Sequence, residues 1–429
     1  MSRIRIAGGR LIDPASGVDA VTDLYIADGH VAALGSAPDG FQADREIDAR
    51  GAVVCPGFID LCARTREPGQ EHKGTIASES AAAAAWGITT LVCPPDTDPC
   101  IDTPAVVELI RRRSEAAGNS RILALGALTH ALDGETLSEM AALKAAGVAG
   151  ISNAEIPVAN TLVMMRALEY AATFDLTVFL RPEDPDLRND GLIHEGAVST
   201  RMGLPGIPEA AETVAVARDL ALIERTGIRA HFCRLSSARS VRMIARAQQD
   251  GLPVTADVAA HQLFLTEMDL LGFNSNCHVH PPLRTQRDRD ALRAAVAEGV
   301  VLAICSDHQP HEPDAKLAPL GETEPGISAL ETLVPLTLRL VDEGVLDLPT
   351  AIARLTSGPG QLFGNGLGRL GVGDRADLCI LHPDVHWQLS EAHLLSRGHN
   401  TPFLGWDFRG KVSHTLLEGE VIYQGSSRT

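Results

Sequence analysis

The sequence predicts an α/β fold, a (β/α)8 TIM barrel that carries a small β-sandwich domain formed by both chain termini. Residues 56–365 alternate short apolar segments with Ala-, Leu- and Glu-rich stretches of helical length, as in TTLVCPP followed by TPAVVELIRRRSEAAG. Repeated strand-then-helix units favour a parallel sheet, and about eight of them favour a closed barrel. Residues 1–55 and 366–429 instead alternate apolar and polar positions between Gly and Asp turns, which is typical of short antiparallel strands.

Composition limits the classes of partner. The chain has 429 residues, 45% of them apolar, and a formal net charge of −18 without a basic stripe, so we expect neither a nucleic acid nor an acidic membrane as partner. The first residues lack the apolar core of a signal peptide, and no run approaches the roughly 18 apolar residues of a membrane span. The eight cysteines have no framework spacing, which suits reduced thiols in a cytoplasmic protein.

One segment carries a family signature. PGFIDLCARTREPGQ, residues 56–70, resembles the signature of the dihydroorotase family of the amidohydrolase superfamily, in which the strand ends in His-x-His followed by Arg-Glu-Pro-Gly. The resemblance continues along almost the whole chain, through TTLVCPPDTDPCID, EDPDL, EGAVSTRMGLPGIPEAAE, HFCRLSSARSV, HPPLR, SDHQPH and NTPFLGWDFRGKVSHTLLEG. It implies a TIM barrel whose site lies at the C-terminal ends of the strands, in agreement with the pattern of apolar segments.

The resemblance also implies a metal-dependent site. In the family, strand-end His, Asp and sometimes carboxylated Lys residues hold one or two zinc ions, which lower the pKa of a bound water toward about 7 so that hydroxide attacks a ring amide. The catalytic Asp of the last strand, which moves the proton, is retained as Asp307. The other expected ligand positions are occupied by Cys62, Arg64, Asn153, Arg181 and Arg234.

All of these replacements make the binding of a metal ion less favourable. Arginine stays protonated and has no acceptor atom, so it repels a cation instead of ligating it. The neutral carbonyl of Asn153 is a poor zinc ligand, and Cys62 with Asp307 does not complete a site. The sequence therefore predicts no metal cofactor, and zinc is expected only if the chain is an active hydrolase.

The three arginines predict a different use of the cavity, as structural cations in ion pairs. The expected pairs join Arg64, Arg181 and Arg234 to Asp307, Asp96 and Glu183. Three arginines against Asp307 and Asp96 leave about +1, the same as we estimate for a two-zinc site with its anions. The alternative is that the arginine forks bind a small anion.

Two other groups are candidate metal sites. His278 and His280 form a new His-x-His, which we interpret as surface or loop histidines because the family has no ligands there. Cysteines also end or nearly end four of the predicted strands and are interpreted as small buried residues, with a thiolate zinc site as the alternative. They are Cys62, Cys93, Cys233 and Cys305.

Only some of the family's substrate-contact positions keep the family residue in this sequence. Arg66 and His311 match family residues that contact the substrate, whereas Asp96 and His280 replace two asparagines. Residues 308–326 are rich in Pro and charge, which predicts a mobile loop over the barrel mouth.

The leading functional hypothesis is a non-catalytic dihydroorotase homologue. The resemblance implies that such a copy assembles with the aspartate carbamoyltransferase catalytic chain in pyrimidine biosynthesis, and we also expect a homo-oligomer. The alternatives are an active hydrolase of dihydroorotate or another cyclic amide with a degenerate metal site, and a small-anion sensor.

Overall fold

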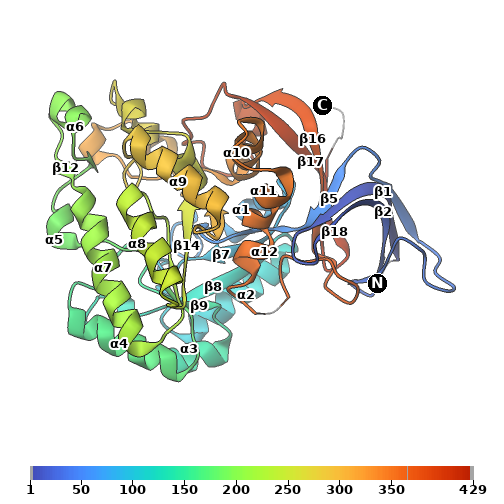
Figure 1. Ribbon diagram of the computed structural model, residues 1–429, viewed down its shortest axis with the longest axis horizontal. Coiled ribbons are helices and arrows are strands. Elements are labelled where there is room, and N and C mark those ends of the chain that lie inside the picture. The colour runs from blue at the N-terminus through green and yellow to red at the C-terminus, as the bar shows by residue number, and fades with distance from the viewer. Residues whose placement is uncertain (1–2, 365, 426–429) are drawn as a thin grey trace.

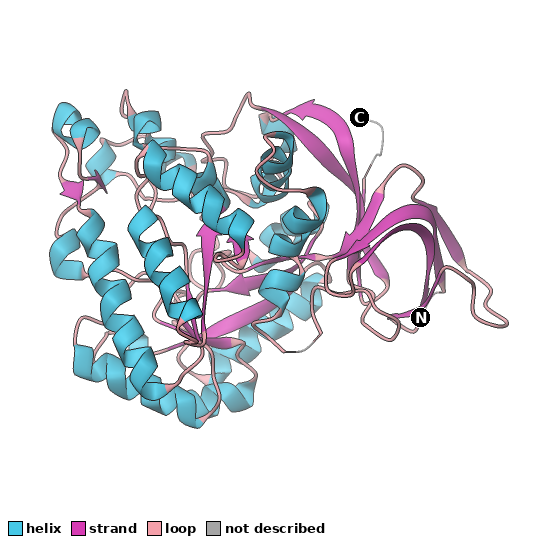
Figure 2. Cartoon of the chain, viewed as in Figure 1, coloured by secondary structure: helices cyan, strands magenta, loops and turns pink. Residues whose placement is uncertain are grey.

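The chain forms a helix-covered barrel joined to a β-rich domain. The computed structural model describes residues 3–364 and 366–425. The barrel contains the middle of the chain, and the β-rich domain contains both of its ends (Figure 1). Figure 2 shows the same division, with helices concentrated around the barrel and the longest strands in the terminal domain. The predicted fold class is confirmed.

Eight parallel strands form the barrel, in the order β6-β7-β8-β9-β10-β13-β14-β15. Their bounds are β6 (Phe58–Asp60), β7 (Ile88–Cys93), β8 (Arg121–Ala127), β9 (Gly150–Ser152), β10 (Val178–Leu180), β13 (Ala230–Phe232), β14 (Val254–Ala259) and β15 (Ala303–Cys305). The first and last strands meet just beyond their ends. There Ala63 bridges His308, and Asp60 accepts the backbone amide of Ser306 at 2.8 Å.

Helices surround the barrel. They are α1 (Ile76–Ala85), α2 (Pro104–Ala117), α3 (Met140–Ala146), α4 (Thr161–Thr173), α5 (Pro185–Arg188), α6 (Ala197–Met202), α7 (Glu209–Thr226), α8 (Ala238–Gln249), α9 (Gln286–Glu298), α10 (Leu330–Asp342), α11 (Leu348–Leu355) and α12 (Ser357–Gly360). A short parallel pair, β11 (Ile193–His194) and β12 (Gly206–Ile207), lies beside α6. Among the described residues, no helix is long and apolar enough to cross a membrane.

Both chain ends enter one eight-stranded sheet, in the order β18-β17-β16-β5-β1-β2-β3, with β4 paired to β1. The strands are β1 (Ile4–Asp13), β2 (Val18–Ala27), β3 (His30–Leu34), β4 (Arg45–Asp48), β5 (Val53–Pro56), β16 (Leu378–Gln388), β17 (Asp407–Leu417) and β18 (Glu420–Gln424). The sheet curls over its own apolar core, which includes Ile6, Ile26 and Leu378.

The two parts are rigidly connected. Strand β5 continues directly into β6 through Gly57, where a Cβ atom would lie 2.2 Å from the side chain of Thr89, so only glycine fits. Arg121 on β8 pairs with Asp377 at 2.9 Å, next to β16. These contacts fix the first barrel strand, and therefore the strand end that carries Arg64, relative to the terminal domain.

Candidate functional site

Charged side chains from six barrel strands converge at the C-terminal end of the barrel. They follow β6, β7, β9, β10, β13 and β15, and they are Arg64, Asp96, Glu155, Arg181, Glu183, Arg234 and Asp307. The three arginine side chains are almost completely buried, at 3–5% exposure. All three predicted ligand-replacing arginines therefore lie at one place.

Glu155 is the centre of this cluster. Its Oε1 lies 2.9 Å from Nη2 of Arg64 and also accepts a hydrogen bond from Nη1 of Arg234. Its Oε2 lies 2.7 Å from Nε of Arg181. One carboxylate thus contacts all three guanidinium groups, and it projects from the loop that follows β9.

Three further carboxylates complete the pairing. Arg64 donates from Nε to Asp96 at 2.8 Å, and Arg181 donates from Nη1 to Glu183 at 2.8 Å. Asp307 accepts from Nη1 of Arg234 at 2.8 Å and lies 3.6 Å from Nη1 of Arg64. The ion pairs expected from the sequence are therefore present.

The balance of charge differs from the expected +1. Three guanidinium groups face four carboxylates, which leaves one net negative charge in the cluster. The expected value is wrong because it omitted Glu155 and Glu183. His280 adds little positive charge, because burial and the nearby Arg181 lower its pKa while its Nε2 lies 2.8 Å from Glu183.

Electrostatic attraction in the cluster outweighs desolvation. Burial alone would raise the pKa of Glu155, but the charges of Arg181, Arg234 and Arg64 hold it well below the ordinary value. The same competition, dominated by Arg181, lowers the pKa of Glu183 to about 2. Both carboxylates are therefore ionised at neutral pH, as the buried arginines require.

The other two replaced ligand positions are occupied by groups with structural partners. Asn153 accepts hydrogen bonds from the backbone amide and the hydroxyl of Thr129, at 3.1 and 2.8 Å, and donates to the carbonyl of Ile156 at 2.9 Å. The thiol of Cys62 lies 3.5 Å from Asp307, and burial raises its pKa well above the ordinary value, so it stays protonated.

This arrangement does not fit a divalent metal ion. Permanently protonated guanidinium groups stand at three ligand positions and are already bound to the carboxylates that a metal would need. The Asn153 amide is bound to backbone and hydroxyl groups, and Cys62 is a neutral thiol. We therefore derive no catalytic step through zinc at this centre.

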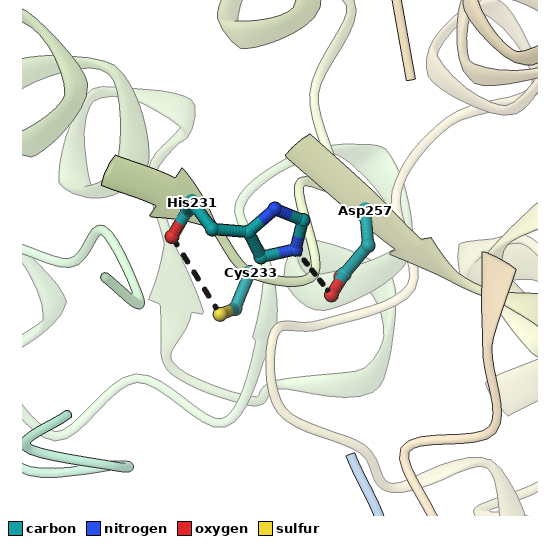
Figure 3. Close-up of side chains that lie close together, drawn as sticks. All are labelled: His231, Cys233 and Asp257. Atoms are coloured by element: carbon teal, nitrogen blue, oxygen red, sulfur yellow. Dashed lines mark hydrogen bonds and ion pairs between the residues drawn. The ribbon is translucent and has the colours of Figure 1, made fainter. Parts of the chain in front are cut away.

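A second group, His231, Cys233 and Asp257, has metal-ligand chemistry and lies deeper in the barrel (Figure 3). Both nitrogens of His231 are already engaged, Nδ1 with Thr255 Oγ1 at 2.8 Å and Nε2 with Asp257 at 2.9 Å. The second oxygen of Asp257 accepts the backbone amide of Arg234 at 2.5 Å, and burial keeps Cys233 protonated by raising its pKa. The hydrogen bonds of this buried group therefore fix the strand end that carries Arg234.

The remaining candidate metal groups are dispersed. Within the described ranges, the four strand-end cysteines form no common ligand cluster, and burial raises the pKa of Cys93 to about 11. The histidines of the His-x-His lie in a loop, as interpreted, but they are buried and not on the surface. His278 contacts Thr323 Oγ1 at 2.8 Å, whereas His280 faces Glu183.

The two retained substrate-contact residues bind each other. Nη2 of Arg66 lies 3.2 Å from Nε2 of His311, and Nε of Arg66 donates to the carbonyl of Pro310 at 3.1 Å. Burial and the neighbouring charge of Arg64 lower the pKa of Arg66 to about 10. The guanidinium that would hold a substrate carboxylate is thus used to hold the loop over the mouth.

Little open space adjoins the arginine cluster. One cavity beside Arg64, Arg66 and Asp96 has a volume of about 10 Å³, and another beside Arg181 and Arg234 is of the same size. Each volume accommodates about one water molecule. A six-membered cyclic amide does not fit into either of them.

The loop over the mouth, residues 308–326, is anchored. Asn400 donates from Nδ2 to the carbonyls of Gln309 and Gly326, at 2.9 and 3.0 Å, and accepts the backbone amide of His311 at 2.8 Å. Asn400 therefore fixes both ends of this loop, and the mobility of the residues between them stays a prediction.

Comparisons with known proteins agree with the signature in the first strand. A family described as "Dihydro-orotase-like" matches residues 51–240. The "Dihydroorotase-like protein" of Pseudomonas putida is 52% identical over 420 residues, 98% of this chain and 99% of that protein. That of Pseudomonas aeruginosa is 51% identical, over 98% of this chain and 100% of that protein. The chain belongs to the dihydroorotase family.

More distant proteins share the family or the fold. The "Dihydroorotase" of Geobacter sp. (strain M21) is 41% identical over 98% of this chain and 99% of that protein. Among solved structures, an L-hydantoinase from Arthrobacter aurescens superposes with a TM-score of 0.87, covering 100% of this chain and 98% of that chain, at 22% identity. This last likeness shows the barrel and its β-rich domain, and nothing of the chemistry.

Sequence reasoning missed Glu155, although a signal for it was present. Glu155 stands two positions beyond Asn153, in the loop after a short apolar strand, where an acidic side chain can reach a neighbouring strand end. His231 and Asp257 were also missed, because their positions inside strands β13 and β14 look like ordinary interior positions.

Removal of the central charge should destabilise the fold. Glu155→Gln keeps the size of the side chain but leaves the three buried arginines without their shared carboxylate. We expect the free energy of unfolding, measured in urea at neutral pH, to fall by about 3–5 kcal/mol. Asp307→Ala should lower the melting temperature for the same reason. The control is Asp96→Asn, which removes one ion pair at a partly exposed carboxylate and should cost less. Unchanged unfolding of both the Glu155 and the Asp307 variants would contradict this account.

The contribution of Glu183 should depend on pH. Its pKa is about 2 in the folded chain, below the ordinary value of about 4.3, so its stabilisation is fully present above that ordinary value and is lost as the pH falls toward 2. Urea unfolding of the wild type and Glu183→Gln should therefore differ most near pH 6 and converge between about pH 4 and pH 2. A difference that stays constant over this range would show that Glu183 is not held ionised by Arg181.

Proposed function

We propose that this chain is a non-catalytic member of the dihydroorotase family that acts in pyrimidine biosynthesis as a structural partner of the aspartate carbamoyltransferase catalytic chain. The observation that carries the first part is the contact of one carboxylate, Glu155, with three buried arginines at the positions of the family's metal ligands. The partner rests on the family resemblance.

The geometry opposes hydrolysis in two further ways. Asp307, the residue expected to move a proton, is bound to Arg234 and lies near Arg64, so its carboxylate serves as a counter-ion. The cavities beside the cluster accommodate about one water molecule each, and Arg66 is bound to His311. A substrate ring would have to displace several buried ion pairs before it reached Asp307.

The preservation of the rest of the molecule supports a structural role. The barrel and the terminal domain keep the fold seen in the L-hydantoinase from Arthrobacter aurescens. The two Pseudomonas relatives that share half of their residues with this chain carry the name "Dihydroorotase-like protein". A stable barrel without a usable centre is suited to presenting a surface to another protein.

Turnover is the direct test of the non-catalytic state. We expect no conversion of dihydroorotate above the protein-free background in either direction, with or without added zinc, when the reaction is followed by absorbance and chromatography. The dihydroorotase of Geobacter sp., 41% identical, is the matched positive control. Metal analysis of protein purified without chelator should find far less than one zinc per chain. Stoichiometric zinc together with turnover would establish the alternative, an active cyclic-amide hydrolase.

The proposed partnership is tested by whether the two proteins assemble into one complex. The full chain and the aspartate carbamoyltransferase catalytic chain of the same organism are co-expressed and analysed on a sizing column with light scattering. We expect them to co-elute as one complex, and we expect carbamoyltransferase activity to fall when this chain is omitted. Separate elution with unchanged carbamoyltransferase activity would refute the partnership, and the mass of this chain alone would test the expected homo-oligomer.

A further inference from the structure

A basic pocket on this chain shares no lining residue with the arginine–carboxylate cluster. It has a volume of about 400 Å³ and lies where helices α8 and α9 begin, beside the start of α7 and the short strand β11. Its charged and histidine lining consists of His194, Glu209, Arg239, Arg242, Arg287 and Asp288. Helices α8 and α9 lie side by side on this face of the barrel (Figure 1).

Three of these arginines have no ion-pair partner. Arg239, Arg242 and Arg287 are exposed and contact no carboxylate in the part of the chain that the structure describes. By contrast, Arg246 on the same helix pairs with Asp250 at 2.8 Å, and Arg289 on α9 pairs with Asp290 at 2.8 Å. Three guanidinium groups without an ion pair among the described residues therefore line this one pocket, in a chain whose formal net charge is −18.

The positions of these arginines are electrostatically unfavourable without an anion. Arg239 and Arg287 are the second residues of α8 and α9, where the helix dipole favours negative charge and disfavours cations. Asp288 offsets part of this positive charge, and it accepts the backbone amides of Ala238 and Thr285 and the hydroxyl of Thr285. Its effect is to join the two helix starts, so that two positive dipole ends and the arginines face the same pocket.

His194 adds a polar atom to the pocket wall. The residue is only 9% exposed, and its Nδ1 lies 3.2 Å from Nη1 of Arg284, so the imidazole is held in the wall of the pocket. The carboxylate of Glu209 has no ion-pair partner within residues 3–364 and 366–425 and opposes an anion. Three arginines against Glu209 and the fully engaged Asp288 still leave the pocket positive.

We propose that this pocket binds a phosphorylated small molecule through Arg239, Arg242 and Arg287. A phosphate group carries about −1.5 to −2 charges at neutral pH and offers several acceptor oxygens, which suits both guanidinium forks and helix starts. The pocket is larger than a phosphate ion, so there is room for the organic part of a phosphate ester. The site does not depend on the proposed structural role of the chain.

Calorimetry with the full-length chain tests the proposal. The probes are inorganic phosphate, adenosine monophosphate and, as the control without phosphate, adenosine, all at low and at physiological ionic strength. We expect saturable binding of both phosphates, weakened by salt, and no binding of adenosine. Tighter binding of the nucleotide than of inorganic phosphate identifies an ester as the ligand class, and equal binding assigns the affinity to the phosphate group alone.

Variants assign the binding to the pocket. Arg239→Ala and Arg287→Ala should each raise the dissociation constant for phosphate by about tenfold, because each removes charge-assisted hydrogen bonds. Glu209→Gln should lower it, since it removes the opposing carboxylate. Arg246→Ala, on the same helix but outside the pocket, should leave it unchanged. The proposal fails if the wild-type chain binds neither phosphate, or if Arg239→Ala and Arg287→Ala bind as the wild type does.

Discussion

Three buried arginines must be neutralised at the centre of this barrel, and the rest of the site depends on that requirement. A guanidinium group cannot lose its proton inside a protein, so each one needs a carboxylate within contact distance. Glu155 meets the need for all three at once, with Asp96, Glu183 and Asp307 on the outer sides. The residues at the replaced ligand positions must therefore be interpreted together. A single arginine at a metal-ligand position would repel the metal and stay unpaired. Three arginines around one glutamate instead form ion pairs within one cluster.

The backbone conformation at the strand ends helps to position the ion pairs. Arg66, Arg234 and Asp307 all have positive φ angles, at 61°, 54° and 50°, which non-glycine residues rarely adopt. Such conformations cost energy and persist only where the surroundings determine them, as the bond from the Arg234 amide to Asp257 does. The strand ends therefore keep a strained, inward-directed geometry although the side chains have changed. The anchored loop and the bond between Arg66 and His311 close the mouth over them.

The sequence was sufficient for the fold and for most of the ion pairs, because both depend on local patterns. The alternation of apolar segments and helices sets the barrel, and an arginine at each strand end must find an acid at another. The sequence marks Glu155 as an acidic side chain in the loop after β9, but its contact with all three arginines depends on how far that loop reaches across the mouth. The burial of His278 and His280 was missed for the same reason. Their depth is set by residues 308–326, which fold back onto them through contacts such as that between His278 and Thr323.

The two groups of arginines in this chain show that the residue type alone does not decide its role. In the barrel centre, every arginine of the cluster contacts at least one carboxylate, and four carboxylates surround the three arginines. In the outer pocket, Arg239 and Arg287 stand at helix starts, and Asp288 beside them accepts backbone amides and a hydroxyl. The arginines of the barrel centre thus have carboxylate partners, and those of the outer pocket have none within the described ranges, so we place the proposed anion site in the outer pocket.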